Sequence, residues 1–201
     1  MDSTKLDAGV YKKESVKKSP RKKRVSKAEW LDRALDVLES EGVQGVRVER
    51  LARDLGIAKA GFYWHFRDRS DLLQSLFDHW AHEFTAVVTG NPDLLEGDPK
   101  TRLYDAMRMI LEHDLAKYDL AIRDWAAHDS AAAKAVRHVT RTRLDFARSI
   151  LSDLGFRGRQ LEMRARLFVC YHTWEQATFL DLSKNERRAL LRLRHKLLVS
   201  R

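Results

Sequence analysis

Residues 48–66, VERLARDLGIAKAGFYWHF, decide the fold of the N-terminal part of the chain. Leu51 and Leu55 are four residues apart, so they lie on the same face of a first short helix. Gly56 follows where the chain must turn sharply, because glycine accepts a positive φ without steric strain. Ile57 then returns to the core. The pattern predicts a short helix that ends in a tight turn.

A second short helix is expected over residues 59–65. Phe62 and Phe66 are again four residues apart and should bury the back of this helix. Its other face would then be left to solvent. A short helix that presents small, basic and aromatic groups is what a reader of the DNA major groove needs. The outward residues are Lys59, Ala60, Gly61, Tyr63 and Trp64.

This pattern resembles the DNA-binding domain of the TetR family of bacterial transcriptional repressors, over about residues 30–73. The resemblance rests on Leu51-Ala52, Leu55-Gly56-Ile57, the aromatic run from Phe62 to Phe66, and then Arg69, Asp71, Leu72 and Leu73. It implies that Lys59, Ala60 and Gly61 lie near base edges. It also implies that Tyr63 and His65 contact the DNA backbone, and that Arg69 binds a phosphate at the start of the next helix. Trp64 would either contact DNA or pack with Tyr63 as an aromatic pair.

Two positions depart from the family pattern. The family usually has serine or threonine at the start of the recognition helix, where this chain has Ala58, so a side-chain cap is lost. It often has threonine before the first motif helix, in contact with a phosphate. Arg47 stands there instead, and its longer cationic side chain is expected to reach a phosphate in another way.

The basic residues are concentrated at the N-terminus. The net charge is +9, and residues 1–25 contribute +6 of it through nine Lys or Arg and three Asp or Glu. This segment has few apolar residues to bury, so it is expected to be disordered. It would act either as an arm along DNA phosphates or as a solvated tail that aids solubility.

Capping signals and apolar spacing predict about nine helices and an all-α fold, without strand alternation. Ser26 and Ser183 each begin a capping box, and Ser70 is expected to cap a long helix to about residue 88. Asp98-Pro99 is expected to begin another helix. Three more helices are expected over about 120–127, 131–154 and 159–181. We therefore expect a helix-turn-helix domain over 26–72 and a helical regulatory and dimerisation domain over 73–201.

The composition also limits the setting. At 201 residues with 44% hydrophobic residues the chain can form a sizeable core, and no apolar run approaches 18 residues. The N-terminus lacks the hydrophobic segment of a secretory signal. The single cysteine, Cys170, suits a reducing compartment, and its apolar neighbours predict a buried, inert thiol rather than a redox sensor. We expect a cytoplasmic, nucleoid-associated protein with no membrane partner.

Catalytic and metal sites find no support in the sequence. His79, His82 and Glu83 lie on one helix, but they flank an apolar face and lack the spacing of known metal motifs. The adjacent pairs His113-Asp114 and His128-Asp129 point about 100° apart on a helix, so they are not dyads. We expect no enzyme activity, no cofactor and no metal.

The body contains candidates for a ligand pocket. They are large or polar-tipped residues spread over several helices, and the alternative is that they form ordinary core. His172 and Gln176, four residues apart, are the best polar pair, although a face between subunits would explain them equally well. The candidates are Trp80, Phe84, Met107, His113, Trp125, Tyr171, His172 and Gln176.

The last two helices are expected to form a homodimer interface. The final helix has more leucines than one stripe needs, and a polar rim of arginines beside them. The expected interface residues are Phe168, Phe179, Leu190, Leu193 and Leu197. By the resemblance, two such heads would bind a palindromic operator in double-stranded DNA as a repressor, and a small-molecule effector would modulate that binding. The alternatives are a ligand-independent DNA-binding or architectural protein, an enzyme built on a helical bundle, and a protein-binding adaptor.

Overall fold

The computed structural model describes residues 24–179 and 181–200, and these residues form an all-α fold, as expected. Nearly all of the basic segment expected to be disordered, residues 1–25, lies outside the described residues. The described part contains nine α-helices, two short 3₁₀ segments and one π segment. None of the described helices is both long and apolar enough to cross a membrane.

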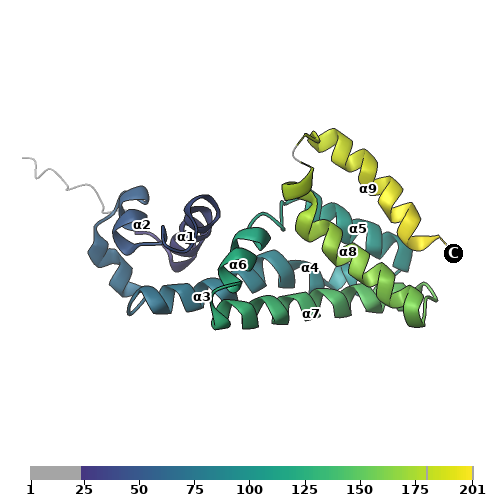
Figure 1. Cartoon of the computed structure of the whole chain (residues 1–201), viewed down its shortest axis with the longest axis horizontal. Helices are drawn as coiled ribbons and strands as arrows, with labels where there is room; N and C mark the ends of the chain where they lie inside the picture. The colour runs from purple at the N-terminus through teal and green to yellow at the C-terminus, as the bar shows by residue number, and fades with distance from the viewer. Residues whose placement is uncertain (1–23, 180, 201) are drawn as a thin grey trace, which may run out of the picture.

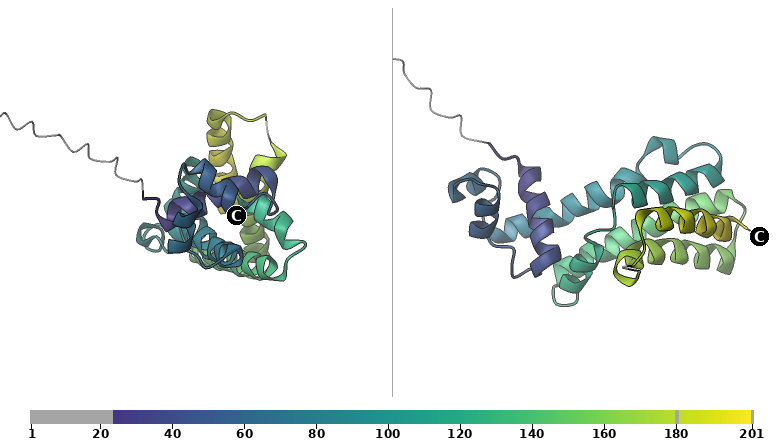
Figure 2. Two further views of the ribbon diagram at one scale, coloured as in Figure 1. Left: turned by 90° about the vertical axis from the view of Figure 1, so that its left-hand side faces the viewer. Right: turned by 90° about the horizontal axis from the view of Figure 1, so that it is seen from above.

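The molecule is elongated, with a small head at one end and a larger helical body at the other (Figure 1). Seen from above, the long helical rod that starts at α3 runs from the head into the body (Figure 2). The helices are α1 (Lys27–Glu41), α2 (Val48–Asp54), α3 (Arg69–Ala81), α4 (Val87–Thr89), α5 (Pro99–Glu112), α6 (Asp119–Ala126), α7 (Ser130–Asp153), α8 (Gly158–Thr178) and α9 (Lys184–Val199).

Most of the predicted helix boundaries follow from local capping. Ser26 forms a complete capping box with Glu29, and Ser183 forms one with Glu186. Asp98 caps α5, with Pro99 in the first turn. The expected cap of α3 was wrong: Asp68 accepts a hydrogen bond from the backbone of Asp71 at 2.9 Å, and Ser70 lies inside the first turn.

The rod between head and body is not a uniform α-helix. After α3 it continues as a π segment, η2 (His82–Ala86), and then as α4. Leu72, Leu76 and Trp80 are fully buried along α3, as their spacing predicts, whereas Phe84 in the π segment is only half-buried. A π turn holds extra backbone compared with an α turn, so it shifts the side chains that follow it around the rod.

Two clusters of buried side chains make up the core, and the first crosses the expected domain boundary at residue 72. This first cluster joins α1, α2 and the second motif helix to α3, α6 and the start of α7. The second cluster fills the far end of the body, between α5, α7, α8 and α9. The head is therefore packed on the body through shared core residues, including Leu76, Phe77, Trp80, Ile122 and Trp125.

Cys170 is exposed, so the expectation of a buried thiol was wrong. On α8, Phe168 and Val169 on one side of it and His172 and Thr173 on the other turn toward the core. Cys170 falls on the opposite face of the same helix. An apolar stretch in the sequence did not reveal this, because α8 carries apolar residues on both faces.

Candidate functional site

The second motif helix is a 3₁₀ helix, η1 (Lys59–Trp64), rather than the α-helix that the spacing predicted. Ala58 precedes it, and no side chain caps it, in line with the missing serine or threonine. Phe62 and Phe66 are buried as expected, and Phe62 contacts the ring of Trp30 edge-to-face at 5.4 Å between centroids. The back of η1 is thereby fixed to α1, and its other face is left free.

The free face of η1 carries the residues expected to contact DNA. The Tyr63 side chain is 58% exposed and Trp64 is 87% exposed. The alternative in which Trp64 packs against Tyr63 is not what the structure shows, because Tyr63 instead rests edge-to-face on Phe62. Ala60 is exposed. A Cβ at Gly61 would lie 3.2 Å from Ile57 Cδ1, so a glycine there also relieves crowding within the turn.

Two cations border this face. Lys59 pairs with Glu49 of α2 at 2.5 Å, and that hydrogen bond raises the pKa of Lys59 and lowers the pKa of Glu49. Both side chains are exposed, so the pair is weak enough for Lys59 to exchange it for a contact with DNA. Arg47 is also exposed, and its Nε donates to the backbone oxygen of Gln44 at 3.0 Å.

His65 and Arg69 have structural partners inside the head. The Nε2 atom of His65 lies 2.8 Å from the carbonyl oxygen of Val25, and because a carbonyl only accepts, the ring donates. Arg69 donates from Nε to Val46 at 2.6 Å and from Nη2 to Val43 at 2.5 Å. The half-buried guanidinium thereby ties the loop after α1 to the start of α3, and the phosphate contact that the resemblance implied stays a prediction.

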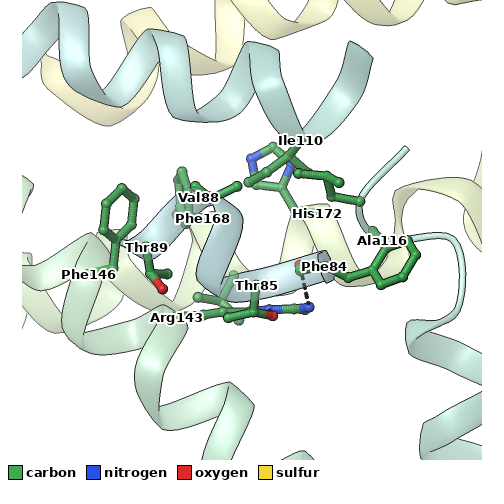
Figure 3. Close-up of a pocket in the computed structure, with 12 residues that line it drawn as sticks. Phe84, Thr85, Val88, Thr89, Ile110, Ala116, Arg143, Phe146, Phe168 and His172 are labelled. Carbon is green, nitrogen blue, oxygen red and sulfur yellow. Dashed lines mark hydrogen bonds between the residues drawn. The ribbon is translucent and has the colours of Figure 1, made fainter. Parts of the chain in front are cut away.

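A cavity of about 30 Å³ lies in the body, between the π segment and α4 on one side and α5, α7 and α8 on the other (Figure 3). Two of the expected pocket residues, Phe84 and His172, line it. Arg143, Thr85 and Thr89 are its other polar residues, and the rest of the wall is apolar. A volume of this size holds about one or two water molecules.

Three other expected pocket residues are part of the core. Trp80 is fully buried and donates from Nε1 to Asp119 at 3.1 Å. Trp125 stacks on Phe77 with 4.6 Å between ring centroids, and Met107 is fully buried in the second cluster. For these residues the alternative of ordinary core packing describes the structure better.

The remaining three expected pocket residues lie outside the cavity wall. His113 is exposed at the end of α5. Tyr171 lies under the guanidinium of Arg194, 3.8 Å from its ring centroid. Gln176 donates to Asp114 in a separate polar groove at the surface, so His172 and Gln176 do not act as one pair.

A buried ion pair beside the cavity escaped the sequence analysis. Asp119, at the start of α6, is fully buried and accepts hydrogen bonds from two nitrogens of Arg143 on α7. Arg143 also donates to the Thr85 hydroxyl at 2.9 Å and to the Phe84 carbonyl at 3.3 Å. The available signal was its spacing, because Arg143 lies four residues after buried Val139 on an otherwise apolar stripe.

The cavity wall is connected to the head through Tyr118. The rings of Phe84 and Tyr118 meet edge-to-face at 5.0 Å, and the Tyr118 hydroxyl donates to Asp36 of α1 at 2.7 Å. Lys117 also donates to Asp36, at 2.8 Å. Burial, together with the hydrogen bond to Asp36, raises the pKa of Tyr118 to about 12. We call Asp36, Lys117 and Tyr118 the joint, since they hold α1 to the body.

The expected interface residues divide between core and surface. Phe168 is 3% exposed and packs in the second cluster, so it cannot contact a partner without unfolding the body. Phe179, Leu190, Leu193 and Leu197 are exposed. Sequence reasoning missed three further exposed apolar residues of α8, at positions close to a heptad spacing: Met163, Leu167 and Trp174.

Comparisons with known proteins agree with this architecture. Residues 31–76 match the family described as bacterial regulatory proteins, tetR family. The chain is 27% identical over 82 residues to the HTH-type transcriptional regulator AcrR of Shigella flexneri, a segment that covers 41% of this chain and 38% of AcrR. The chain thus matches well under half the length of that relative.

Solved structures extend the likeness to the body. The TetR family transcriptional regulator PfmR from Thermus thermophilus has a TM-score of 0.65 at 19% identity, over 87% of this chain and 96% of PfmR. The regulator FadR from Bacillus subtilis, solved in complex with stearoyl-CoA, has a TM-score of 0.62 at 19% identity, over 86% of this chain and 97% of FadR. At these identities the likeness establishes the fold alone.

Proposed function

Because the chain belongs to the TetR family of bacterial regulatory proteins, we propose that it is a dimeric repressor that binds a palindromic operator and releases it when a small ligand binds. The observation that carries this proposal is the free face of η1. Its back is fixed by buried Phe62 and Phe66, while Tyr63 and Trp64 are largely exposed. The family consists of regulators rather than enzymes, in agreement with the absence of catalytic motifs in the sequence.

The face of η1 supports direct contact with DNA. Lys59 can donate to guanine O6 or N7, and Ala60 and Gly61 allow a base edge or a thymine methyl to approach closely. Tyr63, Trp64 and Arg47 are exposed beside them and can contact the sugar-phosphate backbone. One such short helix buries too little surface to select a long site, so two heads are needed.

The exposed stripe of α8 and α9 supports dimerisation. Six large apolar side chains there are each between 37% and 71% exposed, and a second copy would remove them from water. In a two-fold dimer the two α8–α9 pairs would form a four-helix arrangement and set the spacing of the heads. The stripe consists of Met163, Leu167, Trp174, Leu190, Leu193 and Leu197.

The cavity and the joint support control by a ligand. A ligand that pushes on Phe84 would also push on Tyr118, whose hydroxyl holds Asp36 of α1. A weakened joint would let the heads adopt another spacing and lose the operator. FadR of Bacillus subtilis, which has the same fold, was solved with stearoyl-CoA, and this supports a body that can hold a ligand.

A second function is a DNA-binding protein that responds to no ligand. The small size of the cavity, about 30 Å³, favours it, because pockets for small molecules are usually about ten times larger. In that case the head and the dimer would be the same, and no small molecule would change the affinity for DNA.

Selection of bound fragments from genomic DNA tests the proposal. The selected fragments should share a palindrome, and two protomers should bind each site in a mobility-shift titration. Trp64→Ala and Lys59→Ala should weaken binding, whereas Arg192→Ala, on the exposed side of α9, should not. Enrichment of sequences with no shared motif, or equal binding by all three variants, would contradict a sequence-specific head.

A further inference from the structure

Building on the ligand control proposed above, we infer that the cavity binds an uncharged, mainly apolar molecule with one hydrogen-bonding group, and that His172 binds this group. The inference rests on the polar atoms of the cavity wall. Of the described residues that line the cavity, only one has a side-chain nitrogen or oxygen that is fully buried and has no hydrogen-bond partner.

That atom is Nε2 of His172. The residue is 7% exposed, and its Nε2 has no hydrogen-bond partner among the described residues. The ring is held edge-to-face against Phe168, with 4.8 Å between centroids, and Figure 3 shows it among the side chains that line the cavity. Buried polar atoms are nearly always paired in folded proteins, so an unpaired one on a residue that lines a cavity indicates a missing partner.

Arg143, the cation of the cavity wall, is already neutralised. Four of its five N–H groups are used, two by Asp119, one by Thr85 and one by the Phe84 carbonyl. A carboxylate in the cavity would therefore lose its water without gaining a free partner ion. Within the described part of the chain, the residues that line the cavity include no Asp or Glu that could bind an ammonium group.

His172 itself carries no charge near neutral pH. Burial, together with the positive charges of Arg194 on α9 and Arg143 on α7, holds the pKa of its imidazole well below the ordinary 6.5. The acids near these arginines are paired with them, Asp119 with Arg143 and Glu175 with Arg194 at 3.6 Å. A neutral imidazole nitrogen donates or accepts one hydrogen bond, which suits a hydroxyl, carbonyl or amide group.

The rest of the cavity wall favours a ligand that is mainly apolar. It consists mainly of aromatic and branched side chains, and because the cavity holds about 30 Å³, a ligand must push some of them aside. Small, rigid molecules test this chemistry best. The apolar residues of the wall are Phe84, Val88, Ile110, Leu115, Phe146, Phe168 and Val169.

Four ring compounds of similar size serve as probes: phenol, toluene, benzoate and benzylammonium. Their affinities are measured by calorimetry at pH 7.4, where phenol is uncharged. We expect phenol to bind roughly 3- to 10-fold more tightly than toluene, as one hydrogen bond predicts. We expect both ions to bind at least about tenfold more weakly than phenol, since each would be desolvated without a partner. Benzoate or benzylammonium binding as tightly as phenol, or no binding by any of the four, would overturn the inference.

Variants assign the effect to His172. His172→Leu should lose the preference for phenol over toluene, whereas His172→Gln should keep part of it. His138→Leu, a matched change on the exposed face of α7, should bind like the wild type. Should His172→Leu fail to fold, the ring nitrogen signals of the wild type in NMR spectra give a second test. The His172 signals should shift with phenol and not with toluene. A preference that persists without the imidazole would contradict the role of His172.

Release of the operator is measured separately from ligand binding. The proposal of ligand control and the inference about the ligand class can then fail independently. Phenol that binds through His172 and leaves DNA binding unchanged would support the ligand class and contradict ligand control. A charged probe that releases the operator and binds more tightly than phenol would support ligand control and contradict the ligand class.

Discussion

At the scale of single residues, several polar side chains that were expected to contact DNA or a ligand also form hydrogen bonds within the fold. His65 holds the chain entering α1, and Arg69 holds the loop after it. The exposed side chains of η1 are left to contact DNA. Trp64, the most exposed large apolar residue of the described chain, is therefore a better test of DNA contact than Arg69.

Arg69→Ala is expected to destabilise the head. Its two hydrogen bonds to backbone carbonyls are charge-assisted and half-buried, so their loss should lower the free energy of unfolding by about 1–3 kcal/mol. Denaturant titration measures this, with exposed Arg67→Ala as the control. Equal midpoints for Arg69→Ala and wild type, combined with weaker DNA binding, would instead restore the role of Arg69 as a phosphate contact.

His172 should make stability depend on pH in the mildly acidic range. Its pKa in the fold lies well below 6.5, so below about pH 6.5 the unfolded chain takes up a proton that the folded chain refuses. Stability conferred by the neutral imidazole is therefore present above that pH and lost as the pH falls. Between pH 7.5 and 5.5 the wild type should lose up to about 1 kcal/mol more than His172→Gln. Parallel pH profiles of the two proteins, measured by thermal unfolding, would show that His172 titrates normally.

At the scale of helices, the connection between head and body depends on a few contacts. The joint links α1 to the chain before α6, and the first core cluster continues from the head into α3 and α6. The π segment in the rod carries Phe84, whose ring contacts Tyr118 of the joint. It also carries Thr85, whose hydroxyl accepts a hydrogen bond from Arg143. These contacts, rather than the helices themselves, determine how the head sits on the body.

The joint can be measured with a double-mutant cycle on Tyr118→Phe and Asp36→Asn. Tyr118→Phe removes only the hydroxyl that donates to Asp36, so each single change should cost about 1 kcal/mol of stability. The double variant should cost less than the sum of the two, because both changes remove the same interaction. Strict additivity would mean that the two groups do not interact in solution. Tyr104→Phe, at a half-buried position in α5, is the matched control.

At the scale of the whole molecule, we expect the exposed stripe of α8 and α9 to form the dimer interface. Leu193→Glu should give monomers in analytical ultracentrifugation, because it places a charge in the proposed seam, where Leu193 is 59% exposed in one protomer. Arg192→Glu introduces a carboxylate on the neighbouring exposed position and should leave the dimer intact. Monomers that still bind the full operator tightly would contradict the paired-head mechanism.

The basic N-terminal segment should strengthen the electrostatic contribution to DNA affinity. Deleting residues 1–24 removes nine Lys or Arg. The dependence of log affinity on log salt concentration should become shallower, by up to about 0.9 for each phosphate that the segment neutralises. The fold should be unaffected, since the deletion stops before Val25, which packs in the core and binds His65 through its carbonyl. An unchanged slope would favour the solvated tail over the arm.

The sequence by itself determined where most helices lie, the motif of the head and its likeness to the TetR family. Capping boxes at Ser26 and Ser183, the turn at Gly56 and the four-residue spacing of Phe62 and Phe66 act over a few neighbouring residues. These interactions are therefore local, and the sequence alone is enough to predict them. The same holds for the second leucine face of α9, which is present in the sequence and exposed in the fold.

Only the tertiary structure decided which polar groups meet and which face of an apolar helix is buried. Arg143 binds Asp119 and Asp36 binds Tyr118 across 24 and 82 residues of chain, and no local pattern specifies such partners. On α8 Phe168 is buried and Cys170 is exposed. Because α8 is apolar on both sides, the packing of neighbouring helices such as α7 determined which face is buried. Local geometry fixes where a side chain points on its own helix, whereas burial depends on what the rest of the chain packs against that helix.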